Sequence, residues 1–461
     1  MQAILRHLLR LTVLLAVCSF GVFGFAADTA SPSRPNVIFI LADDLGYGDI
    51  GCYGQKRIRT PNIDRLAEQG MRFTQAYAGS TVCAPSRCSL MTGKHTGHAT
   101  VRGNRGSRPK EMALTAEEPT IAEVFKAAGY STALIGKWGV GENDTTGAAN
   151  RKGFDLFFGY QTQFAAHDYY PGFLWRNNER YLLPGNEDGK QVTYSHDVLM
   201  KEALAYVREN RNRPFFLYLA VTIPHANNEA HPNGMQVPTN APYANEDWPE
   251  PEKNFAAMIT RMDDGVGSLL SLLQELGIDD RTLVIFTSDN GPHSEGGHRS
   301  EFFQSSGGLR GQKRDMYEGG IRVPLIARWP GRIKAGTVSD QIVAFWDFLP
   351  TFADLTGQPP PKDIDGISIL PALLENKPVP HPPLYWEFHE RGFFRAVRAG
   401  NWKGVSLDPA KPLELYDLSR DPAETNNVAA VHPEVVKELE AILRRERTPS
   451  EIWPTSIDAG Q

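Results

Sequence analysis

The chain has 461 residues, of which 41% are hydrophobic and 22% charged, and its formal net charge is −6. This length is sufficient for one large hydrophobic core and a smaller second domain. The small excess of acidic residues gives no electrostatic support for nucleic-acid binding.

The first 27 residues are typical of a secretory signal peptide. Arg6 and Arg10 give a positive start, residues 11–25 form an apolar core, and small residues at 24–27 offer a cleavage site. The apolar run is short for a membrane-spanning helix, which needs about 20 residues. The sequence therefore predicts a periplasmic or secreted protein without stable membrane insertion.

Strand and helix patterns alternate along residues 33–377, as in a large α/β domain. An apolar, β-rich run at residues 36–41 predicts a strand buried on both faces. The further predicted strands are residues 72–78, 131–135, 214–221, 282–287 and 323–328, and the predicted helices are residues 61–69, 120–128, 195–209, 254–276 and 346–355. This alternation predicts a large mixed sheet sandwiched by helices.

A glycine pattern follows the first predicted strand. Residues 46–51 match G-x-G-x-x-G, which in a dinucleotide-binding fold opens directly into a helix. Here the next helical pattern begins only at Thr60 and Pro61. The pattern therefore predicts a loop.

The composition changes where prolines cluster, at residues 363–380. Short strand patterns follow at residues 383–388, 394–398 and 402–406, then a turn-rich segment at 415–427 and a helix at 433–445. We therefore expect a smaller C-terminal α+β domain over residues 378–461.

The most specific motif lies after the second predicted strand. Residues 83–87 read Cys-x-Pro-Ser-Arg, and residues 90–93 read Leu-x-Thr-Gly. Pro85 and Ser86 can open a helix, which would place Cys83 just ahead of a helix N-terminus, where a negative oxygen or a sulfate is favoured. Taken alone, a cysteine at such a place is more often a small buried side chain.

This motif resembles the signature of the type I sulfatases, members of the alkaline-phosphatase superfamily. The resemblance implies an alkaline-phosphatase-like fold and a maturation enzyme that oxidises Cys83 to Cα-formylglycine. One hydroxyl of the hydrated aldehyde would attack sulfur, and the other would expel sulfate. Residues 414–428 also resemble the C-terminal region of sulfatases, so the resemblance extends over nearly the whole mature chain.

Two acidic pairs each follow a predicted strand, Asp43-Asp44 and Asp289-Asn290. The carboxyl ends of strands in an open α/β sheet gather the residues of a site, so the two pairs can meet. Three carboxylates and one amide oxygen suit Ca²⁺, or less well Mg²⁺. The resemblance implies that these four residues and the modified Cys83 bind the metal.

The resemblance also implies four further catalytic residues. Arg87 would orient the formylglycine hydrate, Lys137 and Lys313 would bind the sulfate, and His225 would protonate the leaving alcohol. A lone lysine is most often a solvated surface residue, and a loop histidine is often only a hydrogen-bonding group.

One position departs from the family. The family often reads Gly-Lys-Trp-His, and its histidine helps to eliminate sulfate, whereas Gly139 follows Trp138 here. Some other base must then act on the sulfated intermediate. His95 and His167 are the candidates.

Aromatic and polar loops at residues 167–175 and 227–248 have a composition suited to sugar rings. The expected substrate contacts are His95, His167, Tyr169 and Arg310. We therefore expect an exo-acting sulfatase for a sulfated galactan or glycosaminoglycan, with galactose or N-acetylgalactosamine as the sugar.

Two alternatives stay open. The first is a phosphatase or phosphodiesterase of the same superfamily, which would need two zinc ions and a serine or threonine nucleophile. The second is an inactive sulfatase-like protein that binds carbohydrate. The sequence also leaves open whether Cys52 and Cys88 form a disulfide or stay as thiols.

Overall fold

The computed structural model describes residues 34–104 and 112–458. The predicted signal peptide lies outside these residues. The described residues belong to one compact unit that begins at Arg34. Within the described ranges, no helix is both long and apolar enough to cross a membrane.

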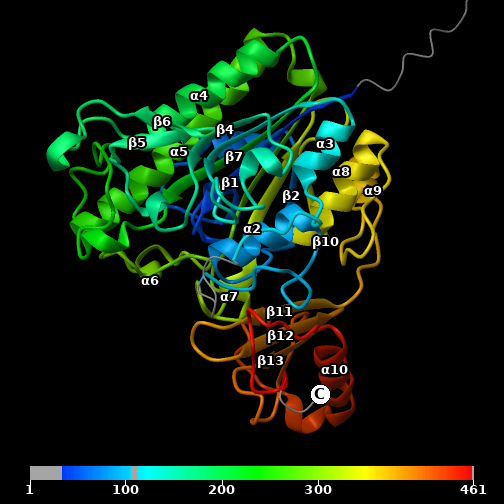
Figure 1. Ribbon diagram of the computed structural model, residues 1–461. Helices are drawn as coiled ribbons and strands as arrows, with labels where there is room; N and C mark the ends of the chain where they lie inside the picture. The colour runs from blue at the N-terminus through cyan, green and yellow to red at the C-terminus, as the bar shows by residue number, and fades with distance from the viewer. Residues whose placement is uncertain (1–33, 105–111, 459–461) are drawn as a thin grey trace, which may run out of the picture. The chain divides into compact units, whose positions relative to one another are not determined.

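The described residues form a ten-stranded mixed sheet at the centre of the fold (Figure 1). Its strands are β1 (Asn36–Asp43), β2 (Met71–Tyr77), β3 (Ser131–Lys137), β4 (Leu156–Tyr160), β5 (Phe173–Arg176), β6 (Glu179–Leu182), β7 (Phe215–Pro224), β8 (Thr282–Ser288), β9 (Arg322–Arg328) and β10 (Thr337–Ala344). They are ordered β10-β2-β9-β8-β1-β7-β3-β4-β5-β6. The central strands β8, β1, β7, β3 and β4 are parallel, so their carboxyl ends lie at one edge.

Helices cover both faces of this sheet. Along β1, Ile38 and Ile40 point into one hydrophobic cluster, and Val37 and Phe39 point into another. The first cluster is covered by α1 (Pro61–Glu68), α4 (Ser195–Asn210) and α5 (Glu250–Glu275), and the second by α2 (Cys83–Thr92), α3 (Ile121–Ala127), α8 (Phe348–Thr356) and α9 (Leu370–Glu375). Two short helices, α6 (Ser300–Phe303) and α7 (Glu318–Ile321), lie between β8 and β9. The predicted sandwich is confirmed, because the central strands carry apolar side chains on both faces.

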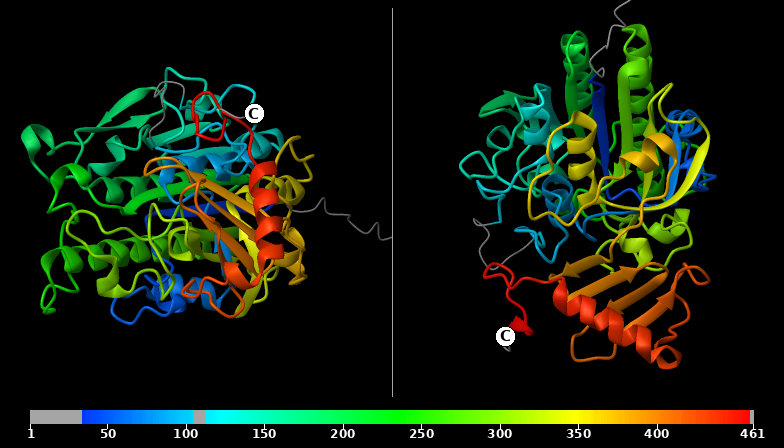
Figure 2. Two further views of the ribbon diagram at one scale, coloured as in Figure 1. Left: turned by 90° about the horizontal axis from the view of Figure 1, so that it is seen from below. Right: turned by 90° about the vertical axis from the view of Figure 1, so that its right-hand side faces the viewer.

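A smaller antiparallel sheet follows, with one helix against it (Figure 2). It consists of β11 (Leu384–Phe388), β12 (Phe394–Ala399), β13 (Trp402–Ser406) and β14 (Glu414–Asp417), with α10 (Pro433–Arg445) packed on one face. The other face packs against the larger part, where Trp386 contacts Trp346 and Tyr77. These contacts lie within one compact unit, so the predicted domain boundary at residue 378 stays a proposal.

The structure contains strands that the sequence analysis did not predict: β4, β5, β6, β10 and β14. Most are short or lie away from the buried centre of the sheet. Strand β6, for example, is an edge strand whose four residues are all exposed, so it lacks an apolar pattern. Helix α2 also begins at Cys83 itself and not just after it.

Residues 46–51 form a loop, as expected. A Cβ atom on Gly46 would lie 2.2 Å from the carbonyl oxygen of Ser305, so the close approach of two backbones explains this glycine. Cys52 and Cys88 form no disulfide in the described structure. They pack into the two different clusters on opposite faces of the sheet.

Candidate active site

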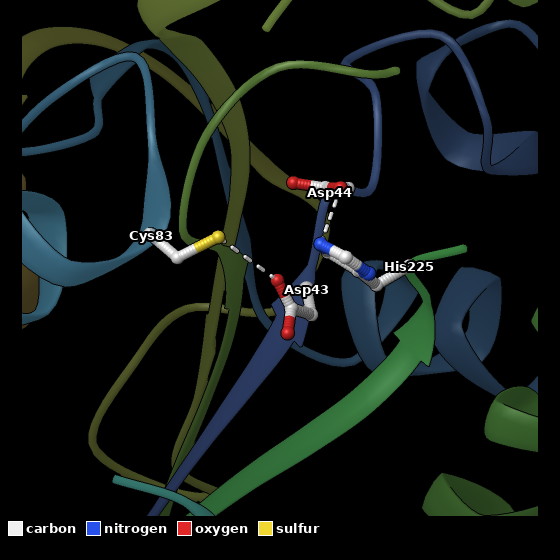
Figure 3. Close-up of side chains that lie close together, drawn as sticks. All are labelled: Asp43, Asp44, Cys83 and His225. Carbon is white, nitrogen blue, oxygen red and sulfur yellow. Dashed lines mark hydrogen bonds and ion pairs between the residues drawn. The ribbon is translucent and has the colours of Figure 1, made fainter. Parts of the chain in front are cut away.

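Several segments meet at the carboxyl edge of the parallel strands. Strand β1 ends at Asp43, β3 ends at Lys137, and His225 directly follows β7. The first turn of α2 brings Cys83 to the same place. Figure 3 shows Cys83 and His225 pointing toward Asp43 and Asp44.

The two acidic pairs lie together, as their positions after β1 and β8 predict. The backbone N–H of Asp44 donates to Asp289 Oδ1 at 3.1 Å, and Asn290 Nδ2 donates to Asp44 Oδ1 at 2.7 Å. Asp44 has a φ of 65°, a left-handed conformation that aspartate tolerates better than most residues. This turn lets two consecutive carboxylates face one point.

The donor set fits a hard divalent cation. Asn290 Oδ1 is buried and has no hydrogen-bond partner among the described residues, so an oxygen ligand is available there. Burial and the nearby Asp43 carboxylate raise the pKa of Asp289 to about 7, although Arg87 opposes this shift. A cation beside these carboxylates would relieve their repulsion. Ligand atoms of Asp43, Asp44, Cys83 and His225 also lie within 4.8 Å of one another.

We expect Ca²⁺ to stabilise the protein much more at pH 8 than at pH 5.5. Without metal, the raised pKa of Asp289 favours the folded state while its proton is bound, and that stability is lost as pH rises through about 7. Calcium would replace the proton, with a stabilisation of about 2.7 kcal/mol at a hundredfold excess over Kd. Thermal unfolding with Ca²⁺ or a chelator at both pH values measures this. Equal Ca²⁺-induced shifts of Tm at both pH values, or no shift in the wild type, would contradict the metal assignment. The Asp289→Asn variant should lose the Ca²⁺-induced shift of Tm.

Three buried cations surround Cys83. Lys137 Nζ lies 2.6 Å from Asp43 Oδ2, and Lys313 Nζ lies 2.7 Å from Asp44 Oδ2. Arg87 bonds Asp289 Oδ2 at 2.8 Å and the carbonyl of Lys137 at 2.8 Å. Burial opposes protonation of both lysines, but the aspartates raise their pKa values above the usual range. The site therefore holds fixed positive charge beside the residue expected to react.

The Cys83 thiol is itself a poor nucleophile. The residue is 2% exposed, and its Sγ lies 3.5 Å from Asp43 Oδ1. Burial raises the pKa of the thiol well above its usual value, and Asp43 and Asp289 add to the shift, while Lys137 opposes it. Since the thiolate is the reactive form, an unmodified cysteine at this place would react slowly.

His225 is held as a neutral imidazole. Its Nδ1 lies 2.6 Å from the carbonyl of Ala226, which makes Nδ1 the donor, and its Nε2 accepts from Lys313 Nζ at 3.1 Å. Burial and Lys313 lower the pKa of His225 to about 3, although Asp44 opposes this shift. The expected proton donor thus carries no proton on Nε2 in this state. A proton given from Nε2 must first come from Lys313.

A cavity of about 390 Å³ opens over Cys83 and includes residues that the sequence analysis did not single out. Its walls are formed by Cys83, Asn104, Gln163, Phe164, His167, His225, Asn228, Glu229, Lys313, Arg314 and Glu390. Phe164 is 69% exposed. Glu390 comes from the loop between β11 and β12, so the smaller sheet contributes to the cavity. No local motif marks Phe164 or Glu390, since only the fold brings them to the site.

Three of the expected substrate contacts, His95, Tyr169 and Arg310, are not among the residues that line this cavity. His95 lies beyond the far end of α2, where it contacts Trp346 and bonds the Asp365 carboxylate through its backbone N–H. Arg310 stacks on Tyr317 at 3.7 Å and bonds the Tyr416 hydroxyl. His95 is close to Cys83 in sequence, but the ten-residue helix α2 lies between them and spans about 15 Å.

Tyr169 has a different position from the one expected. It is fully buried, and its hydroxyl lies 2.9 Å from the carbonyl of Thr222 and 2.5 Å from that of His225. The ring therefore fixes the loop that carries His225, and it does not face the cavity. His167, in contrast, lines the cavity.

A cavity lined by the buried Lys313, beside Lys137 and a cluster of oxygen ligands, suits a tetrahedral anion. The helix-covered mixed sheet is the alkaline-phosphatase-like α/β fold. The chain belongs to the sulfatase family and is a sulfuric ester hydrolase. The family model described as Sulfatase matches residues 35–358, and that of the N-sulphoglucosamine sulphohydrolase C-terminal region matches residues 311–449.

The relatives agree with this assignment. Human arylsulfatase A is 34% identical over 91% of this chain and 89% of its own length. N-acetylgalactosamine-6-sulfatase of Canis lupus familiaris is 32% identical over 97% of this chain and 85% of its own length. The crystal structure of Ps i-CgsB in complex with k-i-k-neocarrahexaose is 29% identical, covers 92% of this chain and 96% of that chain, and has a TM-score of 0.77.

Proposed function

We propose that this chain is an exported, formylglycine-dependent sulfatase that removes sulfate from a sulfated sugar. The observation that carries the proposal is the position of Cys83 at the start of α2, between Lys137 and Lys313 and below the cavity. The N-terminal segment supports export to the periplasm or the cell exterior.

Sequence and structure both support conversion of Cys83. The complete motif at residues 83–87 is the target that a maturation enzyme would recognise, and the buried thiol is poorly reactive as it stands. The hydrated aldehyde would supply a pair of hydroxyls on one carbon, one to attack sulfur and one to release sulfate. A serine or cysteine has no such second hydroxyl.

The oxygen atoms of Asp43, Asp44, Asp289 and Asn290, with the modified Cys83, would hold the metal. Their hard character favours Ca²⁺ over Mg²⁺, because Ca²⁺ tolerates irregular sets of oxygen ligands. The bound cation would stabilise negative charge on the sulfate oxygens. Lys137 and Lys313 would hold the same oxygens from the protein side.

The leaving alcohol would be protonated by His225 and Lys313 acting together. Lys313 Nζ is 3.1 Å from His225 Nε2, so the ammonium would first pass a proton to Nε2, and the imidazolium would then give that proton to the leaving oxygen, with Lys313 left neutral. Arg87 is fixed by Asp289 and by the carbonyl of Lys137, which positions it to orient residue 83.

The sugar preference rests on the cavity and on the relatives. Phe164 offers an exposed aromatic face for the apolar side of a sugar ring, while Asn104, Asn228 and Glu390 offer hydrogen bonds to hydroxyls. The names of the relatives include N-acetylgalactosamine-6-sulfatase and a complex with k-i-k-neocarrahexaose. We therefore favour galactose or N-acetylgalactosamine as the sulfated sugar at the end of a glycosaminoglycan or galactan.

The surroundings of Lys313 weigh against a two-metal phosphatase. Its ammonium lies 2.7 Å from Asp44 Oδ2, 3.1 Å from His225 Nε2 and 3.2 Å from Glu295 Oε2. A second metal ion bound by these three groups would have to occupy the position of the Lys313 ammonium. The intact set of reactive residues likewise weighs against an inactive carbohydrate-binding protein.

Assays of the matured enzyme on sulfated monosaccharides and oligosaccharides test the proposal. We expect release of inorganic sulfate from galactose or N-acetylgalactosamine sulfates at chain ends, and slower release from internal positions. Phosphate esters serve as the comparison. Faster hydrolysis of phosphate esters than of every sulfate would contradict the proposed function.

A further inference from the structure

The side chain of Gln163 occupies the place that a side chain after Trp138 would take. Gly139 has a φ of 79°, and a Cβ atom there would lie 1.9 Å from Gln163 Nε2. Gln163 Nε2 instead donates to the carbonyl of Gly139 at 3.3 Å. An amide cannot accept a proton near neutral pH. Gln163 thus fills the space of the usual histidine without its chemistry.

One ring nitrogen of His167, Nδ1, is bonded to a carboxylate, and the other ring nitrogen, Nε2, is left to act as a base. Its Nδ1 lies 3.0 and 3.2 Å from the two carboxylate oxygens of Glu229. This contact places the proton on Nδ1 and leaves Nε2 as an acceptor, as in histidine bases that a carboxylate orients. Burial and the nearby Lys137 lower the pKa of His167, and Glu229 opposes this shift. The ring is therefore neutral and basic at neutral pH.

The His167 ring lies beside the group that contains residue 83. It stacks on His225 with ring centroids 4.7 Å apart and planes 17° apart. His225 in turn belongs to the group whose ligand atoms lie within 4.8 Å of Cys83 Sγ. His167 and Cys83 line the same cavity, so both side chains face the space in which the sulfated intermediate would form.

Other basic groups of the cavity are already engaged. His225 Nε2 accepts from Lys313, and Glu390 accepts from the backbone N–H of Asn104 and lies 3.6 Å from Arg314. Among the described residues that line the cavity, His167 combines a free ring nitrogen with a carboxylate that stabilises its protonated form.

We propose that the His167–Glu229 pair replaces the missing histidine as the base that frees sulfate, an inference that rests on the proposed function. In this step the O–H bond of the unsulfated hydroxyl on residue 83 breaks, and its proton passes to His167 Nε2. The electron pair of that bond forms the carbonyl. The bond from carbon to the sulfate oxygen breaks, and its electrons leave with sulfate. Glu229 is a positioning residue that also stabilises the imidazolium.

His167→Ala should separate the two halves of the reaction. With an activated aryl sulfate, we expect a burst of close to one phenol per matured site, followed by turnover roughly 10²-fold or more below wild type. Mass spectrometry should find one retained sulfate on the tryptic peptide of residues 73–87. His167→Gln, which keeps a polar side chain beside Glu229, should behave likewise if the alanine variant folds poorly. His432→Ala, at a partly exposed histidine that does not line the cavity, is the matched control.

Glu229→Gln should reduce turnover about tenfold and move the acid limb of the kcat profile to lower pH. The charged and titratable groups around His167 are Glu229, His225, Lys137 and Asp43. Removing the Glu229 charge lowers the pKa of His167, so the ring stays unprotonated to lower pH. Glu438→Gln makes the same charge change at an exposed site and should leave the limb in place.

Two results would overturn the inference. Steady turnover near the wild-type rate in both His167 variants, without burst or retained sulfate, would show that the ring is structural or only binds substrate. An unchanged acid limb in Glu229→Gln would remove the paired carboxylate from the mechanism. If matured wild type itself released neither phenol nor sulfate, the proposed function and this inference would fail together. If wild type were active but the His167 variants showed neither a burst nor retained sulfate, only this inference would fail.

Discussion

Cys83→Ala is expected to abolish sulfate release, with a loss of roughly 10⁴-fold or more, as when other enzymes lose their nucleophile. The lysines, Arg87 and the four other expected metal ligands would remain, but nothing at position 83 could form the bond to sulfur. The fold should survive, because the change removes one sulfur atom at the start of α2 and leaves the helix backbone intact.

Sulfate release and circular dichroism of the two proteins measure this expectation. Cys52→Ala is the matched control, because Cys52 is a half-buried thiol that does not line the cavity. Full activity in Cys83→Ala, with an unchanged spectrum, would exclude residue 83 as the reactive position.

His225→Ala is expected to slow hydrolysis of sugar sulfates about 10²–10⁴-fold and of activated aryl sulfates far less. A sugar alkoxide is a poor leaving group and needs a proton as the bond to sulfur breaks, whereas an activated phenolate leaves unaided. Loss of the ring also removes the route from Lys313, whose Nζ is 3.1 Å from His225 Nε2.

The ratio of kcat/KM for a sugar sulfate to that for an aryl sulfate measures this effect. His167→Ala is the useful comparison, since it should slow both substrates by retaining sulfate on residue 83. Equal losses on both substrates in His225→Ala would assign this histidine to binding or to the structure of the site.

Most residues at the centre of the site lie at or just after the end of an apolar strand, which the sequence pattern marks. Asp43-Asp44 lies at the end of β1, Asp289-Asn290 follows β8, and His225 follows β7. The carboxyl ends of parallel strands meet at one edge, so local patterns were enough to place these residues together.

The rim of the cavity could not be predicted in the same way. Glu390 lies in a loop of the smaller sheet, about 300 positions after Cys83, and Glu229 lies in a short 3₁₀ helix after β7 (Asn228–Ala230). Composition also gave no measure of burial. It therefore did not distinguish Tyr169, which packs under the His225 loop, from Phe164, which is exposed at the rim.

The edge strands were missed for a related physical reason. Strand β6 is exposed along its whole length, and β14 has four residues within a turn-rich segment. Neither has the continuous apolar run that identified β1. Tertiary pairing with neighbouring strands, and not local propensity, determines their conformation.

The central claim is that activity requires an aldehyde at residue 83. The most direct measurement compares preparations made with and without a formylglycine-generating enzyme, and follows both sulfate release and the mass of the tryptic peptide of residues 73–87. We predict that the specific activity rises in proportion to the fraction of this peptide that carries the aldehyde or its hydrate. Full activity in protein whose peptide keeps the cysteine thiol throughout would contradict the account.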